Sequence, residues 1–260
     1  MTAPRNGARG LGIDAIAVKP AECDPREAIG LAVDRLVIDY EGRDHLPDAG
    51  LLAELADSFA VRVTAPVRAD GFDPRGDDAL YDRLPESVGL VLVAGNPAYL
   101  DDRERSRAVA PRLGTMVERA ADPWVGTERV ERIALATGAT QFALLSPGIE
   151  REVRALRAAG FEGDVAVYAP TVRSEAPAEI LDAVGAYVAR RGPVAKRLPD
   201  DAATDSGATG AVWKTLMDAS RKYALVGGRG AVGERVDALR AAGVDHVVAY
   251  PARGIGPFRA

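Results

Sequence analysis

The chain contains eight short runs of apolar residues, rich in valine and isoleucine, that are separated by longer stretches of mixed polarity. Strands of a parallel sheet covered on both faces have nearly continuous apolar sequences, and helical stretches between them are typical of βα units. The predicted strands are Gly12–Val18, Arg35–Asp39, Ala60–Thr64, Val88–Val93, Gln141–Leu145, Asp164–Tyr168, Tyr223–Val226 and His246–Tyr250.

Seven segments between these runs carry apolar residues at spacings of three and four, which predicts helices. These segments are Ala49–Asp57, Arg103–Arg119, Glu128–Thr137, Glu150–Ala159, Ala178–Arg190, Val212–Ser220 and Val232–Ala242. Eight parallel strands with right-handed crossovers can close on themselves, whereas open doubly wound sheets usually have fewer strands. We therefore predict an α/β chain that forms a single (β/α)8 TIM-type barrel domain over residues 1–260.

Two segments fall outside the repeating pattern. Residues 1–10 are polar and short, and we expect a disordered tail there. Residues 193–210 are rich in Pro, Gly, Asp and Ser, which predicts an exposed, flexible loop before the seventh strand. Trp124 and Trp213 are expected to anchor helices.

The second half of the chain repeats one pattern. Residues 151–170 read REVRALRAAGFEGDVAVYAP, and residues 234–251 read ERVDALRAAGVDHVVAYP. Each stretch predicts a helix, a glycine cap after LRAA and then a strand. Either two βα units share a design, or arginine- and alanine-rich helices that end in glycine simply look alike.

Composition excludes several classes of protein. The net charge is −5 with basic and acidic residues interspersed, so neither nucleic acid nor an anionic membrane is an expected partner. One cysteine, Cys23, cannot form an internal disulfide, and two histidines are too few for most zinc sites, so no metal is predicted. The absence of an apolar leader or an apolar run of membrane length predicts a cytoplasmic protein. Four lysines among 33 basic residues suit a GC-rich genome and a salt-adapted host, as in halophilic archaea.

Chemistry in a (β/α) barrel sits at the carboxyl ends of the strands. Lys19 follows the first strand, and Asp39 and Glu41 end the second. A lysine there could form a Schiff base or hold an anion, or it could pair with these carboxylates. We single out Lys19, Asp39 and Glu41 as candidate catalytic residues, while one carboxylate pair alone does not predict a metal.

A glycine-rich turn follows the seventh predicted strand. Residues 228–233 read GRGAVG, which matches GxGxxG, but too few strands follow it for a dinucleotide-binding sheet. Backbone N–H groups at such a turn can approach a phosphate, and barrel phosphate sites usually lie there. Gly227, Gly228 and Gly230 could receive the anion, with Arg229 and Arg253 as a clamp; alternatively, the glycines only satisfy a sharp turn.

Three stretches resemble the luciferase-like flavin- or deazaflavin-dependent oxidoreductases, a family of (β/α) barrels. They are WVGTERVERIALATGATQFALLS at 124–146, VAVYAPTVRSEAPAEILDAVGAYVAR at 165–190 and YALVGGRGAVGERVDALRAAGVDHVVAYPARG at 223–254. The resemblance covers residues 124–256, about half of the chain, and lies in order and spacing rather than in a catalytic residue. The chain is shorter than usual for the family, and its front half lacks the family's recognisable substrate mouth.

The resemblance implies a cofactor, either FMN or the deazaflavin coenzyme F420, lying across the barrel mouth with its phosphate near the strand-seven glycines. Ser146, Tyr168 and Asn96 would then hydrogen-bond the ring or a small-molecule substrate. The protein would position the ring for hydride transfer, to or from a small carbonyl compound or a one-carbon carrier, and a homodimer is expected. Two alternatives remain open: a barrel of this family that lost the cofactor and acts as a binding or regulatory protein, and a lyase or aldolase that uses Lys19.

Overall fold

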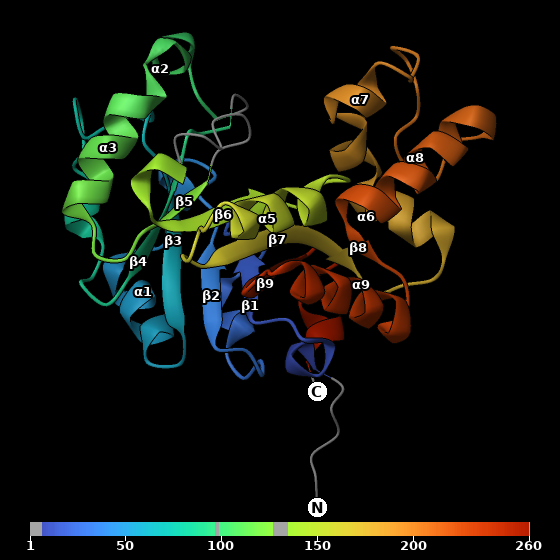
Figure 1. Cartoon of the computed structure of the whole chain (residues 1–260), viewed down its shortest axis with the longest axis horizontal. Coiled ribbons are helices and arrows are strands. Elements are labelled where there is room, and N and C mark those ends of the chain that lie inside the picture. Colours follow the sequence, from blue (N-terminus) through green and yellow to red (C-terminus); the bar gives the residue numbers. More distant parts are fainter. Residues whose placement is uncertain (1–6, 97–98, 127–134, 260) are drawn as a thin grey trace, which may run out of the picture.

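A closed ring of eight parallel strands forms the centre of the molecule (Figure 1). The computed structural model describes residues 7–96, 99–126 and 135–259. The order β6-β5-β4-β3-β2-β1-β9-β7 closes through the pairing of β6 with β7, so the predicted TIM-type barrel is confirmed. The strands are β1 (Ala15–Val18), β2 (Arg35–Ile38), β3 (Ala60–Pro66), β4 (Gly89–Val93), β5 (Trp124–Gly126), β6 (Thr140–Leu144), β7 (Val165–Val172), β8 (Leu225–Val226) and β9 (His246–Pro251).

One predicted strand is not part of the ring. Within Tyr223–Val226 only the two residues of β8 are extended, and they pair with the last two residues of β7, Thr171 and Val172. The eighth barrel strand is instead β5, which lies between β4 and β6. The prediction that Trp124 anchors a helix is wrong, because Trp124 is a buried residue of β5. β5 has only three residues, too few for an apolar run to stand out.

The helices lie outside the ring. They are α1 (Ala49–Ala56), α2 (Asp102–Ser106), α3 (Val109–Arg119), α5 (Ile149–Ala158), α6 (Pro177–Ala189), α7 (Gly192–Ala195), α8 (Gly210–Tyr223) and α9 (Arg229–Ala242), with short 3-10 turns η1 (Ala8–Leu11), η2 (Pro25–Ala28), η3 (Arg43–His45), η4 (Tyr81–Arg83) and η5 (Gly256–Phe258). The predicted helix Arg103–Arg119 is interrupted at Arg107, whose backbone is extended and whose side chain binds the Asp70 carboxylate. The prediction for Glu128–Thr137 lies mostly outside the described residues. None of the described helices is both long and apolar enough to cross a bilayer.

A second, smaller core lies beside the barrel, between α6, α7 and α8. Its buried residues include Leu181, Val184, Val194 and Leu216. The segment predicted as a flexible loop, 193–210, contributes to this core, because it contains most of α7 and the buried residue Ala208. It also crosses α6 so closely at Gly185 that a Cβ atom there would overlap the Thr204 carbonyl oxygen. The last three residues of the predicted tail, 8–10, belong to η1, in which Ala8 and Leu11 are buried; residues 1–6 lie outside the described part of the chain.

The repeated LRAAG sequences share one physical function. Arg157 and Arg240 stand at the same place in the two repeats, and each donates to carbonyl oxygens of the turn that follows its own helix. Each also binds an aspartate just before a strand: Arg157 binds Asp245, and Arg240 binds Asp14. The Asp245 carboxylate accepts the N–H of Val165, the first residue of β7, at 2.8 Å, and the Asp14 carboxylate accepts the N–H of Val247, the second residue of β9, at 2.7 Å. The repeat therefore joins helix ends to the amino edge of the barrel.

Asp14 lies at the seam where β9 meets β1, which closes the ring. We expect Asp14→Ala to lower the free energy of unfolding by about 2–3 kcal/mol, because it leaves the Val247 N–H without its acceptor and removes the carboxylate partner of Arg240. Urea unfolding measures the change. Asp34→Ala is the matched control, since Asp34 forms a largely exposed ion pair with Arg9 and should cost less than about 1 kcal/mol. Equal effects of the two substitutions would contradict this account of the seam.

The contact between α6 and the 193–210 segment predicts a second difference. Gly185→Ala should destabilise the protein by about 1–3 kcal/mol, because the methyl group has no room beside Thr204. Gly114→Ala is its control, because α3 leaves open space around Gly114, and alanine favours helix there by about 0.5–1 kcal/mol. Thermal unfolding of both variants tests the prediction. An unchanged or raised melting temperature for Gly185→Ala would show that the segment does not pack against α6 as described.

Candidate functional site

The inside of the barrel is filled by a column of rings that ends at the mouth. His246 stacks on Trp124 at 5.4 Å between ring centroids near the amino end, where Arg62 also lies over the indole. Phe142 follows at 6.0 Å from Trp124, and Tyr168 lies 5.9 Å from Phe142. Alternate residues of a strand face the same side, so these rings occupy successive interior layers. Because the interior is packed, we place the chemistry at the carboxyl ends of the strands.

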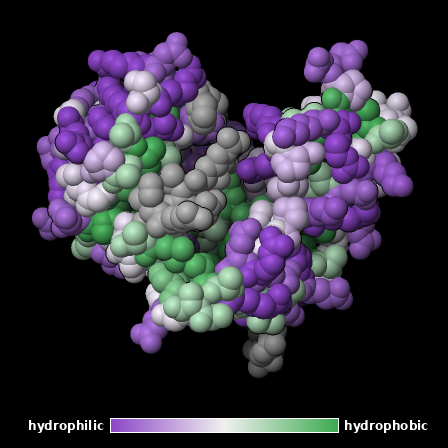
Figure 2. Space-filling view, turned by 45° about the horizontal axis from the view of Figure 1, so that its top comes forward, coloured by the Kyte–Doolittle hydropathy of each residue, from purple (hydrophilic) through white to green (hydrophobic). Residues whose placement is uncertain are grey.

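The three candidate catalytic residues meet at this mouth. Lys19 Nζ lies 3.1 Å from the Glu22 carboxylate and 3.9 Å from the Glu41 carboxylate. Asp39 accepts a hydrogen bond of 2.7 Å from the Tyr168 hydroxyl, which stands 129 residues later in the chain. In the space-filling view a hollow separates the lobe of α2 and α3 from the lobe of α7 and α8 (Figure 2).

Two more tyrosines complete the cluster. The Tyr250 ring stacks on Tyr168 at 6.3 Å, and Lys19 Nζ lies 4.6 Å from its centroid. The Tyr250 hydroxyl binds Glu22. Tyr99, an exposed residue, approaches Glu41 with its hydroxyl at 3.5 Å. Four strands therefore position the cluster: β1 for Lys19, β2 for Asp39 and Glu41, β7 for Tyr168 and β9 for Tyr250.

The surroundings of Asp39 raise the pKa of its carboxyl group into the range near neutral pH. Burial raises the pKa of Asp39 to about 6, because a carboxylate loses hydration there. The charges of Glu41 and Glu22 act in the same direction as burial, while the Tyr168 hydrogen bond and the Lys19 ammonium lower the pKa by favouring the charged form; about 6 is the net result. A carboxyl group with a pKa of about 6 can both accept and return a proton near neutral pH.

Lys19 is held as a cation. Burial opposes its charge, but Glu22, Asp39 and Glu41 outweigh that effect, and the net result is a raised pKa for Lys19. The Glu41 side chain is only 8% exposed, so it depends on Lys19 and on the Ala21 N–H at 3.2 Å for compensation of its charge. Burial and the neighbouring carboxylates also raise the pKa of Tyr250, and burial with Asp39 raises that of Tyr168, so both hydroxyls stay protonated.

The glycine turn is arranged differently from the mouth. Gly227 has a left-handed backbone, with φ at 125°, and Gly228 begins α9. However, the Glu175 carboxylate lies so close to Gly228 that a Cβ atom would overlap it. A phosphate at Gly227, Gly228 and Gly230 would have to displace this carboxylate.

The two arginines predicted to clamp that phosphate are engaged by different groups. Arg229 donates to the Gly10 carbonyl oxygen at 3.0 Å, and Arg253 is paired with Glu179. The described contacts therefore bring neither arginine to the turn as an anion ligand. The predicted roles of Arg229 and Arg253 remain predictions. A carboxylate, that of Glu175, lies against the turn.

Two of the remaining residues border the cluster: the Asn96 carbonyl oxygen accepts the Tyr99 N–H at 3.0 Å, and the Cys23 N–H donates to the Lys19 carbonyl oxygen at 3.1 Å. Ser146 is partly buried after β6, and Asn96 is exposed after β4. Burial raises the pKa of Cys23, so its thiol stays protonated. Among the described residues no three His, Cys, Asp or Glu side chains group as metal ligands would.

Sequence reasoning left out two members of the mouth cluster. Glu22 follows Lys19 by three residues in a turn, a spacing that an ion pair could have indicated. Tyr99 had no signal, because only the fold brings the segment after β4 over Glu41. The ring column was hidden for the same reason: its members come from β5, β6, β7 and β9.

Several solved structures resemble this fold. An F420-dependent secondary alcohol dehydrogenase, in complex with an F420-acetone adduct, aligns over 95% of this chain and 96% of its own, with a TM-score of 0.60 and 11% identity. The monooxygenase RslO1 from Streptomyces bottropensis aligns over 87% of this chain and 84% of its own, with a TM-score of 0.47 and 17% identity. At such identity the first similarity concerns the fold alone.

At the level of sequence, no curated protein matches the chain. A family model described as "Family of unknown function (DUF7388)" matches residues 8–258. That range contains the whole barrel, the mouth cluster and the glycine turn. The chain belongs to the DUF7388 family, whose function is unknown.

Proposed function

We propose that this protein is an oxidoreductase of the luciferase-like kind that interconverts a small alcohol and the corresponding carbonyl compound at the barrel mouth. The observation that carries the proposal is Asp39, a carboxyl group with a pKa of about 6, hydrogen-bonded by Tyr168 where barrel enzymes perform their chemistry. The alignment with the alcohol dehydrogenase along nearly the whole chain supports the reaction class by analogy of fold.

Oxidation of an alcohol removes a hydride from carbon and a proton from oxygen. In the proposed reaction Asp39 accepts the hydroxyl proton, and the Lys19 ammonium stabilises the negative charge that develops on that oxygen. Tyr168 is a positioning residue, because its hydroxyl fixes one carboxylate oxygen of Asp39 and favours the charged form. In the reverse direction protonated Asp39 returns the proton to the oxygen of the carbonyl compound.

A flavin or deazaflavin, when bound, would supply the hydride acceptor or donor. Its phosphate allows a test of fit to this chain. The glycine turn, with Glu175 against Gly228, is a poor match for a doubly charged anion. A pocket with Arg197 and Lys222 in its lining has the donor chemistry that a phosphate requires.

The proposal predicts a pH profile. Alcohol oxidation needs ionised Asp39, so kcat/KM should rise as the pH increases through about 6 and then level off. Asp39→Asn should lower kcat/KM by about 100-fold or more. Tyr168→Phe should move the rise to higher pH, because the Tyr168 hydrogen bond stabilises the ionised carboxylate and its loss raises the pKa of Asp39. F420 or FMN reduction by a panel of small secondary alcohols, measured between pH 5 and 9, provides the readout.

Asp34→Asn is the control for this series, because Asp34 is exposed and paired with Arg9 away from the mouth. It should leave the profile unchanged. Hydride transfer that is absent with both cofactors, or an Asp39→Asn variant as active as the parent, would refute the proposal. The non-catalytic binding barrel would then be the better account.

The lysine-based lyase makes a different prediction. Schiff-base formation needs a neutral amine, and the carboxylates around Lys19 keep it protonated. We therefore expect borohydride to leave Lys19 unmodified when it is added with small aldehydes and ketones near pH 7. Peptide mass spectrometry reads this out. A reduced adduct on Lys19 that is absent from Lys214 would contradict the assignment of Lys19 as a permanent cation.

A further inference from the structure

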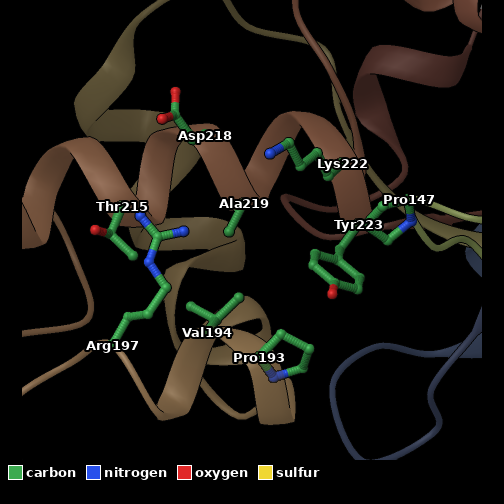
Figure 3. A pocket seen from close by; sticks show the side chains of 9 residues that line it. All are labelled: Pro147, Pro193, Val194, Arg197, Thr215, Asp218, Ala219, Lys222 and Tyr223. Carbon is green, nitrogen blue, oxygen red and sulfur yellow. The ribbon is translucent and has the colours of Figure 1, made fainter.

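A pocket of about 160 Å³ lies between α7, α8 and the turn after β6, outside the mouth cluster (Figure 3). One face of α8 lines it through Thr215, Ala219 and Tyr223, at the spacing of successive helical turns. Pro193 and Val194 of α7 lie opposite. Val194, Thr215 and Ala219 are buried, so the pocket has a mainly apolar, buried floor.

The rim of the pocket is cationic. Arg197 extends from the turn after α7 toward Thr215, and Lys222 lies one helical turn beyond Ala219 on α8 (Figure 3). Within the part of the chain that is described, neither Arg197 nor Lys222 has an ion pair. Asp218, the one acidic residue of the lining, is 3.9 Å from Arg221, which lies outside the lining. Two cations and one anion leave the lining with a net charge of +1.

The pocket borders the barrel mouth. Pro147 comes from the turn at the carboxyl end of β6, only three residues after that strand. Arg191, at the end of α6, lies over the rings of both Tyr223 and Tyr187, at 5.9 Å and 4.2 Å from their centroids. Tyr187 is in turn close enough to Tyr168 to influence its ionisation. A ligand held at the mouth could therefore extend an anionic group into the pocket.

We propose that this pocket binds the phosphate group of a phosphate ester, with Arg197 and Lys222 as its charged ligands. A guanidinium fork and an ammonium group match the oxygens of a doubly charged phosphate, and the Thr215 hydroxyl can contribute a further hydrogen bond. The apolar floor, with Pro147 and Pro193 above it, accommodates the carbon atoms next to the ester oxygen. The proposal does not depend on the reaction at Asp39.

The test uses phenyl phosphate, FMN and riboflavin as probes of the intact protein. Calorimetric titration should detect phenyl phosphate binding that weakens as salt increases. Arg197→Ala and Lys222→Ala should each weaken it at least about tenfold. Asp218→Asn should strengthen it, because it removes the acidic charge from the lining. Lys214→Ala is the matched control: it removes an exposed lysine of the same helix that is not part of the lining, and it should have little effect.

The source of the phosphate follows from competition. If the ester is a flavin cofactor, FMN displaces phenyl phosphate, and the same two substitutions weaken FMN binding. FMN then also binds more tightly than riboflavin, which lacks the phosphate. If FMN does not compete, the site still binds a phosphate ester, and a phosphorylated substrate is its source.

Two results would overturn the proposal. One is no detectable binding of phenyl phosphate at millimolar concentration. The other is binding that survives Arg197→Ala and Lys222→Ala but is lost in Arg229→Ala, which would place the anion at the glycine turn. Both are binding measurements, so they are distinguishable from a failure of catalysis at Asp39.

Discussion

Closure of the barrel between β1 and β9 is the constraint on which the rest of the structure depends. The two strands pair at Ala15 with Val248 and at Ile16 with Ala249, and the Asp14 carboxylate accepts the N–H of Val247, the residue before this pairing. With the ring closed, β9 brings Tyr250 over Lys19, and β7 brings Tyr168 to Asp39. Lys19 and Asp39 directly follow strands, Glu41 comes two residues after Asp39, and Tyr168 and Tyr250 are strand residues, so the closed ring sets the geometry of these side chains.

The mouth concentrates negative charge beside one cation. Glu22, Asp39 and Glu41 surround Lys19, and partial burial prevents water from screening them fully. Burial raises the pKa of Asp39, the carboxylate bonded to Tyr168 of the ring column, and the charges of Glu41 and Glu22 act in the same direction. Above pH 6 the ionised form of Asp39 is less stable in the folded chain than it would be in water, which is a cost often found at sites adapted to proton transfer. The remaining carboxylates keep Lys19 charged.

The fold was predictable to the extent that apolar runs mark buried strands. Seven runs are barrel strands, and the count of eight was correct, although β5 replaces the short strand β8. A strand of three residues such as Trp124–Gly126 is too short for a pattern of apolar residues to be recognised. The segment of β8 resembled a barrel strand because it is also apolar and pairs with β7. The resemblance of the LRAAG repeats was visible, but the partner of each arginine became clear only from the order of strands in the ring.

The mouth was partly predictable, because the strand-end rule brings Lys19, Asp39, Glu41 and Tyr168 together. Its electrostatic properties were not predictable, since they depend on burial and on Glu22.

The glycine turn suggested more from its sequence than the structure supports. Its sequence suits a phosphate, but Glu175, from the segment after β7, lies against it. In the cationic pocket, the face of α8 follows from helical spacing, whereas the position of Arg197 depends on how residues 193–210 pack against α6.

The most direct test of the central claim is the titration of Asp39 itself. With ¹³C label in the aspartate carboxyl groups, the NMR signal missing from Asp39→Asn identifies this side chain, and its chemical shift can be followed from pH 3 to pH 9. The account predicts a midpoint near pH 6. A midpoint near 3.8, the ordinary value for aspartate, would mean that the mouth does not prepare Asp39 for proton transfer.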